Sequence, residues 1–176
     1  MGLFDRGAGS GEPWEVDVIT TEYVISGRVE GGGLKWGWTY FEYAVTSGPA
    51  RPFEFVATAA RSTGALPAPA VVGRQAAVTR GSALVALAPR GDTAIGLWEQ
   101  WNTMAPVAAE VLIGPYLLTG SVLSPDGSAT SPILGASFPV RDATLRRIDG
   151  YGDGAPIELA RATIDARFVH MVSATR

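Results

Sequence analysis

Hydrophobic and polar residues alternate along short stretches of the chain, and this period of two indicates β-strands. The longest stretch covers residues 14–29, where Val16, Val18, Tyr23 and Ile25 belong to the alternating set, and it predicts one strand, or one strand that bends. Shorter stretches, bracketed by glycine or proline, lie at residues 36–45, 53–58, 71–79 and 83–87. Short strands between such turns predict an all-β fold of the barrel or sandwich type.

Two segments depart from this pattern. Residues 1–13 are rich in glycine, which predicts a flexible N-terminal arm. Within residues 90–105, Leu97, Trp98 and Trp101 are spaced like one face of a helical turn. We therefore expect a short helical linker between two all-β regions.

The pattern of the first β-region recurs in the second. Residues 18–29 align without a gap with residues 111–122, so that Tyr23 matches Tyr116 and Gly27 matches Gly120. Two later blocks keep the same order along the chain, with 53–55 matching 138–140 and 76–78 matching 162–164. Ordered matches of this kind predict an internal repeat.

The repeat divides the chain into two small barrel-like β-modules, residues 14–89 and 106–174, joined by the linker. A glycine inside a strand usually marks a bulge or a sharp bend. Gly27 and Gly120 therefore predict such a feature at the same place in each module.

The second module presents a strand around Gly120, a strand at 138–145 and a late apolar strand at 168–172. In this order of elements, each module resembles Sm-like small β-barrels and small bacterial β-domains of the same strand order. The resemblance implies a small barrel and, from the Sm-like proteins, RNA binding. The loop with Asp and Asn that Sm-like proteins use for RNA is not recognisable in either module.

Composition narrows the classes of function. The chain has 176 residues, of which 47% are hydrophobic and only 18% charged, with a net charge of −3 and no cysteine. The low charge predicts a surface covered by a protein partner or by self-association, and the negative sign disfavours nucleic acid. Without cysteine there are no disulfides or thiolate metal sites. The chain begins with no secretory signal and contains no apolar run long enough to cross a bilayer, so we expect a cytoplasmic protein without a membrane span.

No motif in the chain predicts catalysis. His170 is the one histidine, and alternation within 168–172 makes it a half-exposed strand residue; no Gly-x-Ser-x-Gly motif accompanies it. Residues 149–154 have the aspartates and glycines of a calcium loop but lack the terminal glutamate, and Asp-Gly pairs are typical of turns. We therefore expect no catalytic residue, no metal and no cofactor.

The candidate interaction residues are aromatic. Trp36, Trp38 and Tyr40 fall on one face of the strand predicted at 36–45, and Phe41 and Tyr43 fall on the other. Three interpretations remain open: a strand buried on both sides, a protein-contact surface, or a platform on which bases or sugars stack.

Together these observations favour a non-catalytic structural or interaction protein, either a homo-oligomer or a subunit of a larger assembly. One alternative is the binding of RNA or single-stranded nucleic acid by an Sm-like or OB-like barrel. Another is a small-molecule-binding barrel enzyme.

Overall fold

The structure is a computed structural model and describes residues 13–29, 53–70, 73–78, 84–90, 101–135 and 137–174. Within these residues lie ten β-strands: β1 Trp14–Thr20, β2 Tyr23–Val29, β3 Phe53–Ser62, β4 Gln75–Val78, β5 Leu84–Arg90, β6 Ala105–Ile113, β7 Tyr116–Ser124, β8 Ser137–Arg147, β9 Ile157–Asp165 and β10 Val169–Ala174. Three short 3-10 helices accompany them: η2 Trp101–Thr103, η3 Ser131–Leu134 and η4 Ala166–Phe168. The predicted all-β class is confirmed.

The alternation over residues 14–29 belongs to two strands, β1 and β2, and not to one strand that bends. The Thr20 hydroxyl oxygen accepts hydrogen bonds from the backbone N–H of Tyr23 at 3.0 Å and of Glu22 at 3.3 Å. A side-chain oxygen that binds the backbone two and three residues ahead stabilises a turn. The chain reverses here without glycine or proline, and that is why the pattern reads as continuous.

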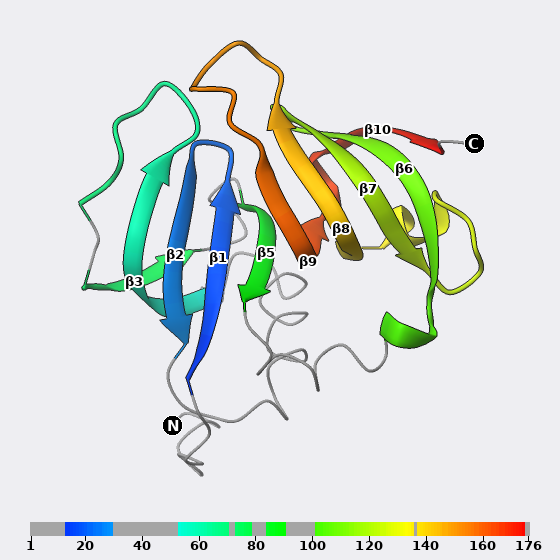
Figure 1. Cartoon of the computed structure of the whole chain (residues 1–176), viewed down its shortest axis with the longest axis horizontal. Coiled ribbons are helices and arrows are strands. Elements are labelled where there is room, and N and C mark those ends of the chain that lie inside the picture. The colour runs from blue at the N-terminus through cyan, green and yellow to red at the C-terminus, as the bar shows by residue number, and fades with distance from the viewer. Residues whose placement is uncertain are drawn as a thin grey trace.

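The ten strands form one open antiparallel sheet in the order β10-β6-β7-β8-β9-β5-β1-β2-β3-β4. We expected two separate barrels, but β5 pairs with β1 on one side and with β9 on the other, which joins the two halves edge to edge (Figure 1). Of the predicted helical linker at 90–105, the structure describes the ends that belong to β5 and β6, the 3-10 helix η2 and Met104, and Leu97 and Trp98 lie outside the described residues. The predicted arm also lies outside them, except for Pro13.

The two halves of the sheet have the same strand order. The first half reads β5-β1-β2-β3-β4 and the second reads β10-β6-β7-β8-β9, so the fifth strand of each half pairs with the first and the others follow as a meander. We call two residues counterparts when they hold the same place in these two sets of ladders. Val18 lies opposite Ile25, and their counterparts Val111 and Leu118 lie opposite each other.

The irregularities of the ladders also correspond. The register between β2 and β3 shifts between Ser26 and Gly27, and the register between β7 and β8 shifts between Thr119 and Ser121, on either side of Gly120. Neither glycine has a positive φ. Glycine is needed at both positions because the facing strand leaves no room for a side chain. A Cβ on Gly27 would lie 2.7 Å from the carbonyl oxygen of Val56, and one on Gly120 would lie 2.5 Å from the Cα of Ala143.

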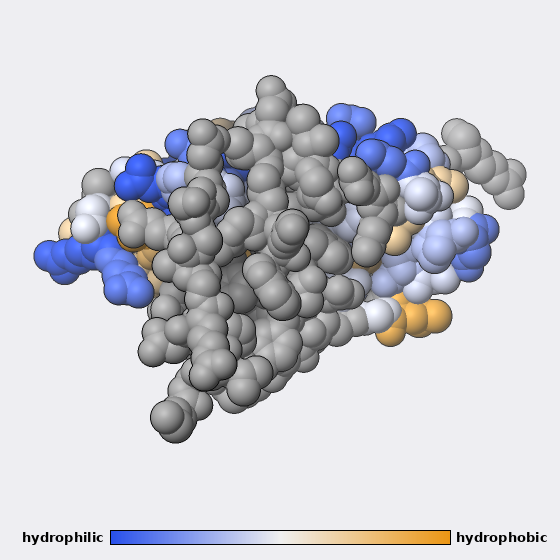
Figure 2. Space-filling view, turned by 90° about the horizontal axis from the view of Figure 1, so that it is seen from below, coloured by the Kyte–Doolittle hydropathy of each residue, from blue (hydrophilic) through white to orange (hydrophobic). Residues whose placement is uncertain are grey.

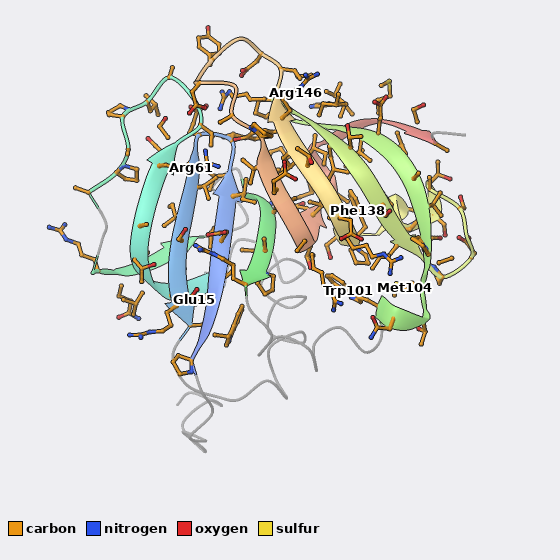
Figure 3. All side chains as sticks on the ribbon, in the orientation of Figure 1. Glu15, Arg61, Trp101, Met104, Phe138 and Arg146 are labelled. Atoms are coloured by element: carbon orange, nitrogen blue, oxygen red, sulfur yellow. The ribbon has the colours of Figure 1, made fainter. Side chains whose placement is uncertain are left out.

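The described residues form two hydrophobic cores along the sheet. The smaller belongs to the first half and contains Trp14, Val16, Phe55 and Leu87. The larger fills the second half around Phe138, which Figure 3 labels, and it also includes residues of β1, β2 and β5. The larger core therefore extends across the line where the two halves meet.

Candidate functional site

The predicted interaction residues Trp36, Trp38 and Tyr40 lie outside the described residues. Two other features of the described part bear on contact with a partner. The junction between the halves shows how one half of this chain binds the other, and the strands that end the sheet are the candidates for contact itself.

The strands β5 and β9 form the junction. Ala86 lies opposite Ile164 and Leu87 opposite Thr163, and all four are at most 1% exposed. Successive residues of β5 point to opposite faces; Leu87 belongs to the smaller core and Ala86 to the larger. The junction is therefore an interior part of the fold.

At one end of the junction, the side chain of Tyr116 at the start of β7 reaches into the first half. Its hydroxyl lies 2.6 Å from the hydroxyl oxygen of Thr63 and donates a hydrogen bond to the Thr20 carbonyl at 3.1 Å. Tyr116 is 1% exposed. The phenol also lies 3.4 Å from the Thr21 carbonyl, so all three of these partners are residues of the other half, next to the β1–β2 turn and the end of β3.

Arg147, at the end of β8, strengthens the same contact. Its guanidinium donates to both carboxylate oxygens of Asp149, at 2.7 and 2.8 Å, to Glu22 at 3.4 Å and to the Thr21 carbonyl. It also lies 5.8 Å from the centre of the Tyr116 ring. The Arg147 side chain is 5% exposed, whereas those of Glu22 and Asp149 are about one-third exposed. One buried cation therefore binds carboxylates of both halves, and its contact with Asp149 has the bidentate geometry that is strongest for arginine.

The ionisation of these groups follows from their surroundings. Burial raises the pKa of the Tyr116 phenol, although the hydrogen bond with Thr63 and the charge of Arg147 oppose the shift. The hydrogen bonds from Arg147 lower the pKa of the Asp149 carboxyl. At neutral pH the cluster therefore consists of a neutral phenol beside a bound ion pair, which suits a structural junction.

The second candidate is the pair of strands that end the sheet. Within the described residues, β4 pairs only with β3, and β10 pairs only with β6. By position, β4 is the counterpart of β9 and β10 is the counterpart of β5. The sheet therefore ends in the same two kinds of strand that meet at the junction.

Residues of the second half also remain accessible where the first half is covered. Several buried residues of the first half have counterparts that are half-buried or exposed, among them Leu112 for Ile19, Leu117 for Val24, Ile148 for Thr63, His170 for Val85, Met171 for Ala86 and Ser173 for Ala88. We call four hydrophobic members of this set, Leu112, Leu117, Ile148 and Met171, the outer patch. Ile148 is 48% exposed and Met171 is 53% exposed.

The candidate chemical residues of the sequence lie apart from one another. His170 is exposed on β10, and Asp149 is bound by Arg147 in the loop between β8 and β9. In the described part of the chain, no three histidine, aspartate or glutamate side chains approach closely enough to hold a metal ion. A recess lined by Trp101, Asn102, Leu123, Arg141 and Arg161 has a volume of about 10 Å³. A recess of this size has room for about one water molecule.

Figure 2 shows the molecule from below, coloured by hydropathy. Among the residues coloured there, small hydrophobic areas lie between hydrophilic ones at both ends of the molecule. No helix in the described segments is long and apolar enough to span a membrane.

Comparison of the chain with models of protein families, with curated proteins and with solved structures finds no match. The function is therefore argued from the junction and the sheet edges alone.

Proposed function

We propose that this chain is a non-catalytic subunit of a larger protein assembly, and that the two end strands of its sheet are its contact sites. The observation that carries the proposal is the character of these strands. β4 has the sequence Gln-Ala-Ala-Val and β10 has Val-His-Met-Val-Ser-Ala. Neither contains Lys, Arg, Asp, Glu or Pro.

Exposed edge strands usually carry such residues, because an unprotected edge presents backbone N–H and C=O groups to any other strand. An edge without them is suited to β-augmentation, in which another chain adds a strand to the sheet. The outer patch beside β10 supplies hydrophobic surface for the same contact, since protein interfaces are richest in apolar residues at their centre.

The equal strand order and register of the two halves support a further element of the proposal. We infer that the halves are copies of one five-stranded, barrel-like module, and that the chain is a tandem repeat of it. In that case the junction between β5 and β9 is itself an example of the contact that such modules make.

The proposal is tested with the full chain, tagged and isolated under native conditions from the cells that produce it. We expect it to sediment in extract as a species well above its 18.4 kDa mass. Met171→Lys, which places a charge on β10, should reduce the fraction of large species, since a charged side chain on the edge opposes strand addition.

Leu134→Lys is the matched control, because Leu134 is also an exposed hydrophobic residue, 89% exposed, but belongs to η3 and not to an end strand. This variant should sediment like the unaltered chain. A chain that sediments at 18.4 kDa in extract, or two variants that lose the large species equally, would contradict the proposal.

A further inference from the structure

The strands β4 and β10, each of which has one partner among the described residues, are complementary in a specific sense, because their counterparts β9 and β5 pair with each other inside this chain. The counterpart of β4, which is β9, therefore already pairs with the counterpart of β10, which is β5. The internal junction thus shows in full how such a pair is arranged.

The register of a pair formed by β4 and β10 follows from the ladders. Phe53 lies opposite Val78 and Phe138 opposite Ile164, so Val78 is the counterpart of Ile164 and Ala77 that of Thr163. Ile19 lies opposite Ala86 and Leu112 opposite Met171. Met171 is therefore the counterpart of Ala86 and Val172 that of Leu87.

We propose that a second copy of this chain adds its β4 to β10 of the first copy, antiparallel, with Val172 opposite Ala77 and Met171 opposite Val78. The inference rests on the proposed function and names its partner. It repeats at the end of the sheet the pairs Leu87–Thr163 and Ala86–Ile164 of the internal junction.

The exposure of the outer patch favours a second copy of this chain, and not an unrelated protein, as the partner that binds β10. Each residue of the patch is the counterpart of a residue that the internal junction buries, so the first half of another copy, placed like the second half in this chain, would cover all four. In that arrangement Tyr23 of the added copy, the counterpart of Tyr116, would approach Ile148, the counterpart of Thr63.

Such a contact joins different surfaces of identical chains. A contact of this type leaves one end free to bind again, so it generates a closed ring or an open filament instead of a symmetric pair. The ion cluster has no equivalent at this second contact, because the counterparts of Arg147 and Glu22 are Ser62 and Pro115. We therefore expect the contact between chains to be weaker than the internal junction and to depend on concentration.

Disulfide trapping tests the register directly, because the chain has no cysteine. Two single-cysteine chains, Ala77→Cys and Val172→Cys, are purified separately and mixed under mild oxidation. Residues opposite each other in an antiparallel pair lie about 4.5–5.5 Å apart at Cα, within the reach of a disulfide. We expect mixed dimers to form at least about tenfold faster than from Gln75→Cys with Val172→Cys, because pairing raises the local thiol concentration only for the matched positions.

The Cα distance between opposed residues alternates between wide and narrow along an antiparallel pair, so Val78→Cys with Met171→Cys is examined in parallel. This second combination also tests the register if one of the first variants does not fold. Disulfide dimers formed by Val172→Cys alone, or by Ala77→Cys alone, at the rate of the mixture would indicate symmetric pairing and overturn the proposal. So would equal rates for matched and unmatched positions.

Sedimentation of the unaltered purified chain separates this inference from the proposed function. We expect species above 18.4 kDa whose share rises with concentration. A chain that is large in extract but remains at 18.4 kDa alone at every concentration would leave the proposed function intact and exclude a second copy as the partner.

Discussion

The strands β5 and β10 hold the same place in the two halves but have opposite surroundings. β5 lies between β1 and β9, and Val85 and Ala86 are 0% and 1% exposed. Their counterparts on β10, His170 and Met171, are exposed. The difference shows that burial here depends on the neighbour across the strand and not on the place within a half. It also defines what a neighbour of β10 would have to cover.

The largest expected effect on the free energy of unfolding comes from a lysine at Ala86, compared with a lysine at its counterpart Met171. Ala86→Lys would place a charge without a partner in the larger core, and we expect a loss of about 3–5 kcal/mol in the free energy of unfolding. Met171→Lys should change the unfolding free energy of the single chain by less than about 0.5 kcal/mol, as is usual for exposed positions. Urea unfolding at low protein concentration measures both values. Equal losses would mean that β10 is as enclosed as β5.

The next effect concerns the ion cluster, which only the internal junction possesses. Arg147→Ser, the residue found at the counterpart position 62, should cost about 2 kcal/mol, since the buried cation has partners that are partly exposed. Arg146→Ser is the control, because Arg146 is exposed on the same strand (Figure 3). If both variants unfold at the same urea concentration, the cluster does not stabilise the junction.

The cluster also predicts a dependence on pH. The pKa of Asp149 is lowered in the folded chain, so its stabilising contribution is complete above the ordinary value of 3.8 and is lost as the pH falls through the folded pKa. The unfolding free energy of the original chain should therefore fall more steeply below pH 4 than that of Asp149→Asn. Parallel curves for the two proteins between pH 2 and 5 would contradict this assignment.

A smaller effect tests whether the halves share their bulges. Gly27→Val and Gly120→Val should each cost about 1–3 kcal/mol, because the added side chain overlaps the facing strand in both halves. Gly135→Ala is the control, since a Cβ there would meet its nearest atoms at 3.4 Å, an ordinary contact. Thermal unfolding of the three variants is the measurement. A cost at one strand glycine alone would show that the two bulges are not equivalent.

The smallest expected effect on stability concerns a hydroxyl that β9 has and β4 lacks. The hydroxyl of Thr163 is buried at the junction and has no hydrogen-bond partner among the described residues, whereas its counterpart on β4 is Ala77. Thr163→Val keeps the shape and removes this hydroxyl, so we expect a gain of about 0.5–1 kcal/mol. A loss of stability of that size, measured by urea unfolding, would indicate that the hydroxyl is satisfied.

Part of the fold was accessible from sequence because strand periodicity is local. The alternating pattern located β3 and β5, and the blocks matched by alignment, such as Phe53 with Phe138, lie at corresponding places in the ladders. The strand limits were less accurate: β5 continues through Pro89 to Arg90, where we expected a turn.

The junction could not be predicted in the same way. Pairing of β5 with β9 joins distant segments, and neither strand carries a local mark of which strand it will meet. The cluster was missed for a similar reason: Arg147, Tyr116 and Thr63 are unremarkable one by one, and only the fold brings them together. The aromatic residues that did carry a signal, Trp36, Trp38 and Tyr40, lie outside the described residues.

The long separation between Leu87 and Thr163 has a consequence for how the chain is made. At roughly 5–20 residues per second, translation needs roughly 4–15 s after β5 is complete before its partner β9 exists. During that interval a nascent first half presents the Ala- and Leu-rich edge of β5 to its surroundings, and neighbouring ribosomes on one messenger hold several such edges close together. Pairing of this edge with another nascent chain would compete with its pairing to β9, and slow translation between the two halves would lengthen the interval in which it can do so.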